Sequence, residues 1–363
     1  MKKLSFLPAR PGFILRFGSL LGIIALICQS CLVGTEPPRW SYHEEYRLAI
    51  LNLNTHSVAH FPEQQIYGPL SMAFMAGDSI INILTEYGIY SVKANGTGLR
   101  TILRFSREIS DPGENAFSSD GTALTFSASK GSSREIFVYD FLADTLEQIT
   151  DTPEVFERYP SFSHSKRRIA FTVWGYAPDN RNYVDQAVAV YDRVSQNQIE
   201  FIRYNPDNGR NNFVQFFYPA FSWDDQKLIY IKFRYEIPGH DLMAFDFRNH
   251  VITKLDSMVS DRSRLWTSPQ RDVILYTKIA NPGYLTTITS TGEAFQIVAG
   301  ISPSYRSQYT LSPNTQLVSY SIRPLTWCRI DGTQAHYLEW GKAPAFSFDG
   351  NSMVFLEGEE VLD

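Results

Sequence analysis

A short motif recurs along this chain and constrains its fold more than any other feature. The best copy is Asn115–Phe126, which reads N-A-F-S-S-D-G-T-A-L-T-F. Apolar residues alternate with polar ones on both sides of Asp120-Gly121, which is the period-2 pattern of two β-strands joined by a tight turn. Each copy therefore predicts an antiparallel pair of strands.

The copies follow one another at a nearly constant distance. We align them on Phe74, Phe117, Phe162, Phe221, Thr267, Leu311 and Phe346. The spacings are 43, 45, 59, 46, 44 and 35 residues. A period of roughly 40 to 45 residues is typical of a four-stranded propeller blade.

The second half of each unit repeats as well. Three apolar segments end at an aspartate that can begin a turn, and a further apolar segment follows each of them: Ile136–Asp140, Val188–Asp192 and Met243–Asp246. No segment after residue 45 shows a sustained helical period. We therefore expect an all-β chain that forms a single β-propeller of about seven four-stranded blades, with six or eight blades as the alternatives.

The two ends of the repeat region complement each other. The last copy stops near Leu356 after two strands, whereas Tyr46–Asn54 and Ser57–Phe61 are typical of a third and fourth strand without a preceding pair. A blade built from both ends would leave no half-blade edge exposed. We expect N- and C-terminal strands to close the last blade of a propeller domain at residues 46–363.

The motif Pro-x-Phe-Ser-x-Asp-Gly, followed by strands ending in Phe and in Tyr-Asp, resembles the TolB-like (WD-repeat-like) propeller family. The resemblance covers Tyr46 to Leu356. It implies a fold and almost nothing about function, because the repeated Phe residues build the core and the Asp-Gly pairs build turns. The translocation protein of that family has an additional α/β domain; we expect no such domain here, so its role is not transferred.

The first thirty residues differ from the rest of the chain. Four basic residues and no acidic one come before the apolar run Leu20–Ile27, and the first acid is Glu36. A basic start, a short apolar run and a small residue before the cut are typical of a secretory signal. The run is too short for a mature membrane-spanning helix.

The end of this segment is similar to the lipobox of bacterial lipoproteins. Ser30 precedes Cys31, and the resemblance implies that Cys31 is lipidated; an ordinary signal peptide cleaved nearby is the alternative. We expect a lipoprotein signal peptide at 1–30 and a tether at 31–45. Leu32 stands where the inner-membrane retention pattern usually has Asp. The expected location is therefore the bacterial cell envelope, lipid-anchored to the outer membrane and facing the periplasm.

Charge excludes one class of partner. The whole chain has a net charge of −5, and loss of residues 1–30 removes four basic groups and no acid, which leaves −9. Binding to nucleic acid needs a basic footprint, so we expect no nucleic-acid partner. Only Cys328 would then remain beside Cys31, and we expect it to be a buried structural thiol.

No catalytic or cofactor motif occurs in the chain. It has no Gly-x-Ser-x-Gly, no Gly-x-x-x-x-Gly-Lys and no His-Glu-x-x-His. His56 and His60 are four apart, but the region is predicted to be a hairpin, on which that spacing does not pair side chains as it would on a helix. We expect no catalytic residues, no metal and no cofactor.

Two insertions indicate where a binding site could lie. The long spacing between Phe162 and Phe221 places extra residues at Val173–Asp185 and Arg203–Phe217, and both connections should emerge on one face of a propeller. They are rich in aromatic residues, and Arg or Tyr begins several innermost strands there. The predicted ligand or partner residues, of types enriched at binding hot spots, are Arg158, Trp174, Tyr176, Tyr218, Arg264 and Arg306.

We expect a non-enzymatic envelope lipoprotein whose propeller binds a protein or peptide partner. The alternative is a glycan-active lyase or hydrolase, or a carbohydrate-binding module, that uses the channel mouth. An enzyme would need convergent carboxylates or metal ligands there. The available residues are Glu157, Glu236, Asp241 and His240.

Overall fold

The computed structural model describes residues 44–153, 155–175, 185–203, 214–234, 239–260, 263–279, 284–300, 308–321, 324–339 and 341–360. All of these except Glu360 belong to one compact unit, Glu44–Glu359. The regular elements among them are β-strands, without any helix, so the expected all-β class is confirmed. Over the same ranges, no helical segment has the length and hydropathy needed to cross a bilayer.

The strands pair as antiparallel neighbours in groups of four along the chain. The first four-stranded sheet contains β3 (Pro69–Phe74), β4 (Ile80–Thr85), β5 (Gly88–Lys93) and β6 (Arg100–Arg104). Another contains β23 (Gln308–Leu311), β24 (Leu317–Ser321), β25 (Leu325–Arg329) and β26 (His336–Leu338). In both sheets the order in space is the order in sequence, which is the arrangement that the repeat predicts.

Two larger sheets each contain two such groups. One contains β7 (Asn115–Phe117), β8 (Ala123–Lys130), β9 (Ser133–Asp140), β10 (Thr145–Gln148), β11 (Val155–Phe162), β12 (Arg168–Gly175), β13 (Asp185–Asp192) and β14 (Asn197–Arg203). The other contains β15 (Val214–Phe221), β16 (Lys227–Arg234), β17 (His240–Asp246), β18 (Ile252–Val259), β19 (Trp266–Thr267), β20 (Ile274–Lys278), β21 (Tyr284–Ile288) and β22 (Ala294–Gly300). A single residue pair joins the two groups in each sheet, Phe156 with Arg134 and Val259 with Lys278.

The remaining sheet combines the two ends of the described chain. It contains β1 (Glu44–Asn52), β2 (Val58–Ile66), β27 (Lys342–Phe346) and β28 (Ser352–Glu360). Its order is β2-β1-β28-β27, so the N-terminal strand is hydrogen-bonded to the C-terminal one. Leu48 and Val354 are both fully buried in one hydrophobic cluster.

The hydrophobic core lies between successive groups of strands. One cluster joins Ile136 and Val138 of β9 to Ile169 and Phe171 of β12, and all four are fully or nearly fully buried. This follows from the alternation, because every second side chain of a strand faces the neighbouring group. The repeated Phe221 is fully buried in a similar cluster, whereas Phe117, which we assigned to the core, is only half-buried.

The Ser-x-Asp part of the motif builds the turn after the first strand of a group. Ser118 Oγ donates a hydrogen bond to Asp120 Oδ1 at 2.7 Å and accepts one from the Ala123 amide at 2.9 Å. The copies at Ser222 and Ser347 make the same pair of bonds with Asp224 and Asp349 and with the amides of Lys227 and Ser352. These residues therefore have structural roles.

The sequence did not reveal a bulge in three first strands. Tyr159, Tyr218 and Ala343 adopt positive φ angles of 55°, 50° and 50°, and the strand register shifts at each of them. The residue after each is a proline. Non-glycine residues seldom adopt this conformation, which costs roughly 1–3 kcal/mol, so the surrounding sheet must stabilise it. The bulge redirects the side chains next to it.

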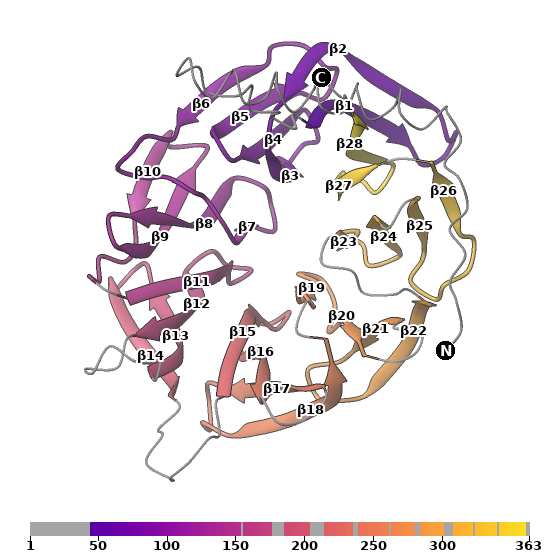
Figure 1. The fold of residues 1–363 in the computed structure, drawn as a ribbon. Helices are drawn as coiled ribbons and strands as arrows, with labels where there is room; N and C mark the ends of the chain where they lie inside the picture. Colours follow the sequence, from indigo (N-terminus) through magenta and orange to yellow (C-terminus); the bar gives the residue numbers. More distant parts are fainter. Residues whose placement is uncertain are drawn as a thin grey trace, which may run out of the picture. The chain divides into compact units, whose positions relative to one another are not determined.

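The first strands of the groups gather around one centre. In Figure 1, β3, β7, β11, β19, β23 and β27 lie toward the middle of the unit Glu44–Glu359. Residues from these strands, or from the turns directly after them, line a single cavity.

Candidate functional site

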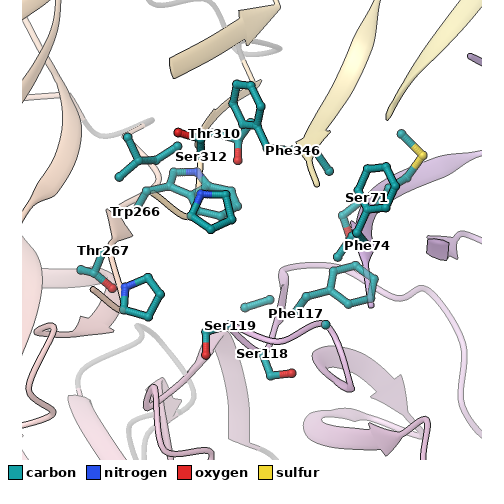
Figure 2. A pocket seen from close by; sticks show the side chains of 18 of the residues that line it. Ser71, Phe74, Phe117, Ser118, Ser119, Trp266, Thr267, Thr310, Ser312 and Phe346 are labelled. Atoms are coloured by element: carbon teal, nitrogen blue, oxygen red, sulfur yellow. The ribbon is translucent and has the colours of Figure 1, made fainter. Parts of the chain in front are cut away.

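The central cavity has a volume of about 270 Å³. Figure 2 shows that its lining comes from segments far apart in the sequence, from Ser71 of β3 to Phe346 of β27. No carboxylate side chain belongs to the described lining, which is built from aromatic rings, hydroxyl groups, Arg264 and His164. The cavity therefore provides apolar surface, one permanent positive charge and a few polar groups.

Aromatic side chains lie on both sides of the cavity. Phe74, Phe117 and Phe346 form the aromatic wall, and Trp266 and Thr267 lie across the space from them (Figure 2). The three phenylalanines are repeat positions in β3, β7 and β27. The alternation of these first strands thus supplies both core and cavity surface.

Arg264 is the cationic group of the cavity. It is half-buried, it donates a hydrogen bond to the Asn115 carbonyl, and its guanidinium lies 5.4 Å from the centre of the Trp266 ring. Burial lowers the pKa of Arg264, although Tyr218, Tyr309 and Glu114 act in the opposite direction. An arginine remains charged at neutral pH even so.

His164 lies in the turn after β11 and shares a hydrogen bond with Thr267, with 3.3 Å between Nε2 and Oγ1. Burial lowers the pKa of His164, although Asp225 and Asp224 oppose the shift. At neutral pH the ring is therefore neutral and can accept or donate a hydrogen bond. Sequence reasoning missed His164, and it also missed Trp266, which directly precedes the aligned Thr267.

An aromatic and cationic cluster is formed by β11, β12 and β15. The Arg158 guanidinium lies 5.3 Å from the ring centres of both Tyr159 and Trp174. The Tyr159 and Tyr218 rings are 4.5 Å apart, and Phe217 lies 6.0 Å from Trp174. We call these five residues the mouth cluster, after the channel mouth at which the sequence placed three of them; none of the five is among the described lining residues of the central cavity. The bulges at Tyr159 and Tyr218 are what bring side chains of two strand groups together.

The charge of Arg158 is compensated within the protein. Its guanidinium is paired with Glu114, which also accepts a hydrogen bond from Ser127 at 2.8 Å. Burial disfavours the charged guanidinium, but Glu114 outweighs that effect, so the pKa of Arg158 lies above its usual value. Arg134 is likewise paired, with Asp111 at 3.0 Å.

The structure brings together four of the predicted partner-binding residues. Arg158, Trp174 and Tyr218 belong to the mouth cluster, and Tyr218 is close enough to Arg264 to act on its charge. Tyr176, Arg306 and the predicted lipidation site Cys31 lie outside the described residues. Phe216 is a buried strand residue and Phe217 belongs to β15, although we had placed both in a loop.

The structure describes three of the four residues considered for catalysis. Glu157 is fully buried beside the equally buried Glu135, and Asp241 is paired with Lys254 at 2.9 Å. His240 is buried against the Phe233 ring at 4.3 Å, while Glu236 lies outside the described residues. Within the described ranges, no group of three or more His, Cys, Asp or Glu side chains could hold a metal ion.

The two histidines of the N-terminal hairpin also have separate neighbours. The His56 ring lies 4.3 Å from that of His336, whereas His60 contacts Glu357 at 2.9 Å. Cys328 is buried and unpaired, and burial raises the pKa of its thiol to about 11. A structural thiol is what the sequence predicted.

Comparisons with known proteins give structural likenesses only. No family model matches the chain, and no curated protein matches it. An oligogalacturonate lyase in complex with manganese is 12% identical, with 85% of this chain and 82% of that chain covered and a TM-score of 0.56. An oligogalacturonate lyase from Vibrio parahaemolyticus is also 12% identical, with 87% and 84% covered and a TM-score of 0.53. TolB from Acinetobacter baumannii is 15% identical, with 92% and 67% covered and a TM-score of 0.49.

At such identities these likenesses show the fold alone. Together with the four-stranded groups around one cavity, they define the class: the chain is a β-propeller. TolB, whose family the repeat motif resembles, is among the structurally similar proteins. The activities of the similar proteins do not follow from the shared fold.

Proposed function

We propose that this chain is a non-enzymatic lipoprotein whose propeller binds a protein or peptide partner in the bacterial envelope. The observation that carries the proposal is the central cavity, whose lining combines the aromatic wall with a charged arginine. Such a cavity suits a ligand with both apolar and polar groups. The mouth cluster contributes Trp, Tyr and Arg, the residue types that dominate binding energy in protein interfaces.

The proposal includes a single closed propeller of seven blades. The described strands pair in seven groups of four, and the last group contains both chain ends, which supports this count. A closed ring leaves no sheet edge at which another chain could pair. It also provides a rigid frame for the loops and the cavity.

The location is also a proposal and rests on residues 1–45. Acyl chains on Cys31 would hold the propeller at a membrane surface, and the tether would allow it to reach a partner in the same compartment. The outer membrane, with the propeller in the periplasm, is the location that Leu32 favours by resemblance.

The glycan-active alternative has the fold likeness to the lyases in its favour. A lyase or hydrolase needs an acid and a base, or a metal, at the reacting bond. The described part of the cavity offers His164 and Arg264 for such roles. Incubation of the purified protein with oligogalacturonate, followed by measurement of unsaturated product, separates the two functions: release of product would favour the enzyme.

Capture of partners from membranes tests the binding function. Full-length protein and its Trp174→Ala variant are used as bait, and captured proteins are quantified by mass spectrometry. Because loss of a tryptophan anchor often costs 2 kcal/mol or more, we expect the specific partner to fall by roughly tenfold or more.

Trp223→Ala is the matched control. Trp223 is 45% exposed in the turn after β15 and outside the mouth cluster, so its loss should leave capture unchanged. Equal capture by the wild type and by Trp174→Ala would contradict the assignment of this surface.

A further inference from the structure

We propose that the ligand of the central cavity is a peptide segment that carries a carboxylate, and that Arg264 binds this carboxylate. An apolar side chain of the same segment would lie against Phe74, Phe117 and Phe346. The inference rests on the proposed function and specifies the chemistry of the partner.

The charge of Arg264 has no counter-ion among the described residues. Its side-chain contacts are a backbone carbonyl of Asn115 and the face of Trp266. Arg158 and Arg134, by contrast, are each paired with a carboxylate. A half-buried charge without an opposite charge is costly, and an incoming anion would offset that cost.

The nearest acid does not supply this counter-ion. Glu114 acts on Arg264 without a direct ion pair, and its two oxygens contact Arg158 and Ser127. The Asn115 carbonyl also orients the guanidinium, and the Trp266 ring supports it from one side within the range of a cation–π contact. Arg264 is therefore held in place with donors still available to a carboxylate.

Three hydroxyl groups of the cavity are already hydrogen-bonded within the protein, which makes a sugar a less suitable ligand. Ser118 and Ser312 each donate a hydrogen bond to a side chain of their turn and accept one from a backbone amide. Ser71 donates a hydrogen bond to the side chain of Asn115 at 2.5 Å. A sugar ring presents several hydroxyls, and each needs a hydrogen-bond partner when it is buried. The aromatic wall is instead suited to a hydrocarbon side chain.

The size of the cavity points to an extended segment. About 270 Å³ lies near the lower end of the roughly 300–1,000 Å³ of small-ligand pockets, which is too small for a folded domain. A protein partner would insert a loop or a chain end. Either could bring the carboxylate, from an Asp or Glu side chain or from a C-terminus.

Matched synthetic peptides test the proposal. Purified full-length protein is applied to an array of hexapeptides that contain an aromatic or aliphatic residue. In one matched pair this residue is next to Asp or Glu, or next to Asn or Gln. In the other it is next to a C-terminal acid, or next to a C-terminal amide. We expect the wild type to prefer acid over amide by about tenfold or more, because a charge-assisted bond is lost in the amide.

Three variants assign this preference to one residue. Arg264→Gln should abolish the acid preference, and Arg264→Lys should keep part of it, since the charge remains. Arg329→Gln removes a positive charge at an exposed position on β25, and this variant should keep the full preference for acidic peptides. Thermal unfolding of each variant shows that it is folded.

The outcomes separate this inference from the proposed function. Peptides that bind without acid preference, or an acid preference that survives in Arg264→Gln, would overturn the role of Arg264 and leave peptide binding intact. Absence of binding to any peptide would overturn both. If the protein bound oligogalacturonate in an Arg264-dependent manner and bound no peptide, the claim that the ligand is a peptide would be wrong, and the ligand would be an acidic glycan.

Discussion

Glu157 illustrates how burial changes the chemistry of a single residue. Its side chain is fully buried, as is that of the neighbouring Glu135, whose carboxylate oxygens accept hydrogen bonds from the Thr152 amide at 3.3 and 3.2 Å. Burial, together with the charge of Glu135, raises the pKa of Glu157 to about 8. Glu157 is therefore largely protonated at neutral pH in the folded protein.

This shift predicts a pH-dependent stability. Between the unfolded value near 4.5 and the folded value near 8, the unfolded chain releases the proton while the folded chain keeps it. The stability contributed by the neutral carboxyl is present below pH 4.5 and is lost as the pH rises through 8, by up to about 5 kcal/mol. Glu157→Gln should therefore be more stable than the wild type above pH 7, and its free energy of unfolding should change less with pH.

Thermal unfolding between pH 5 and 8.5 checks this prediction. Glu339→Gln is the control, because Glu339 is exposed and its replacement should leave the profile as it is. A Glu157→Gln profile parallel to that of the wild type would show that Glu157 does not retain its proton.

At the scale of elements, the turns join one strand group to the next. Gly121, in the turn between β7 and β8, has a φ of 65°, and a Cβ at this position would lie 1.9 Å from the Phe74 carbonyl oxygen of β3. The Asp-Gly turn was predicted from the sequence alone. Its contact with the preceding group of strands was not, because that contact joins residues more than forty positions apart.

Gly121→Ala should therefore destabilise the protein strongly, by about 3 kcal/mol or more, since a backbone atom must move and the φ is unfavourable for alanine. Gly131 provides the comparison: its φ is 62°, but a Cβ there would meet nothing within 4 Å. Gly131→Ala should cost only about 1–2 kcal/mol. Chemical denaturation measures both, and equal losses would show that the close approach at Gly121 has no energetic effect.

At the scale of the whole molecule, the proposed anchor determines where the propeller works. Cys31→Ser should shift the full-length protein from the membrane fraction to the soluble fraction, because each buried methylene of an acyl chain contributes about 0.8 kcal/mol. Cell fractionation and immunoblotting in a bacterial host measure the shift.

Cys28→Ser is the matched control, since Cys28 lies within the predicted signal peptide and its loss should leave the protein in the membrane fraction. If Cys31→Ser remained in the membrane fraction, the lipid anchor would be wrong and an uncleaved segment or a membrane partner would have to retain the protein.

The sequence by itself determined the β-strands, the turns and the propeller class. These follow from local patterns, the alternation around Phe117 and the Asp120-Gly121 turn, repeated at a constant spacing. It also predicted Arg158, Trp174, Tyr176, Tyr218, Arg264 and Arg306 as a group, because two insertions and the entries to the innermost strands should emerge on one face.

Only the tertiary structure decided what those residues contact. The bulges at Tyr159 and Tyr218, the pairing of Arg158 with Glu114 and the lack of a described counter-ion for Arg264 arise between strand groups. The raised pKa of Glu157 has the same origin. Charge compensation and burial depend on distances through space, and a pattern along one chain does not contain them.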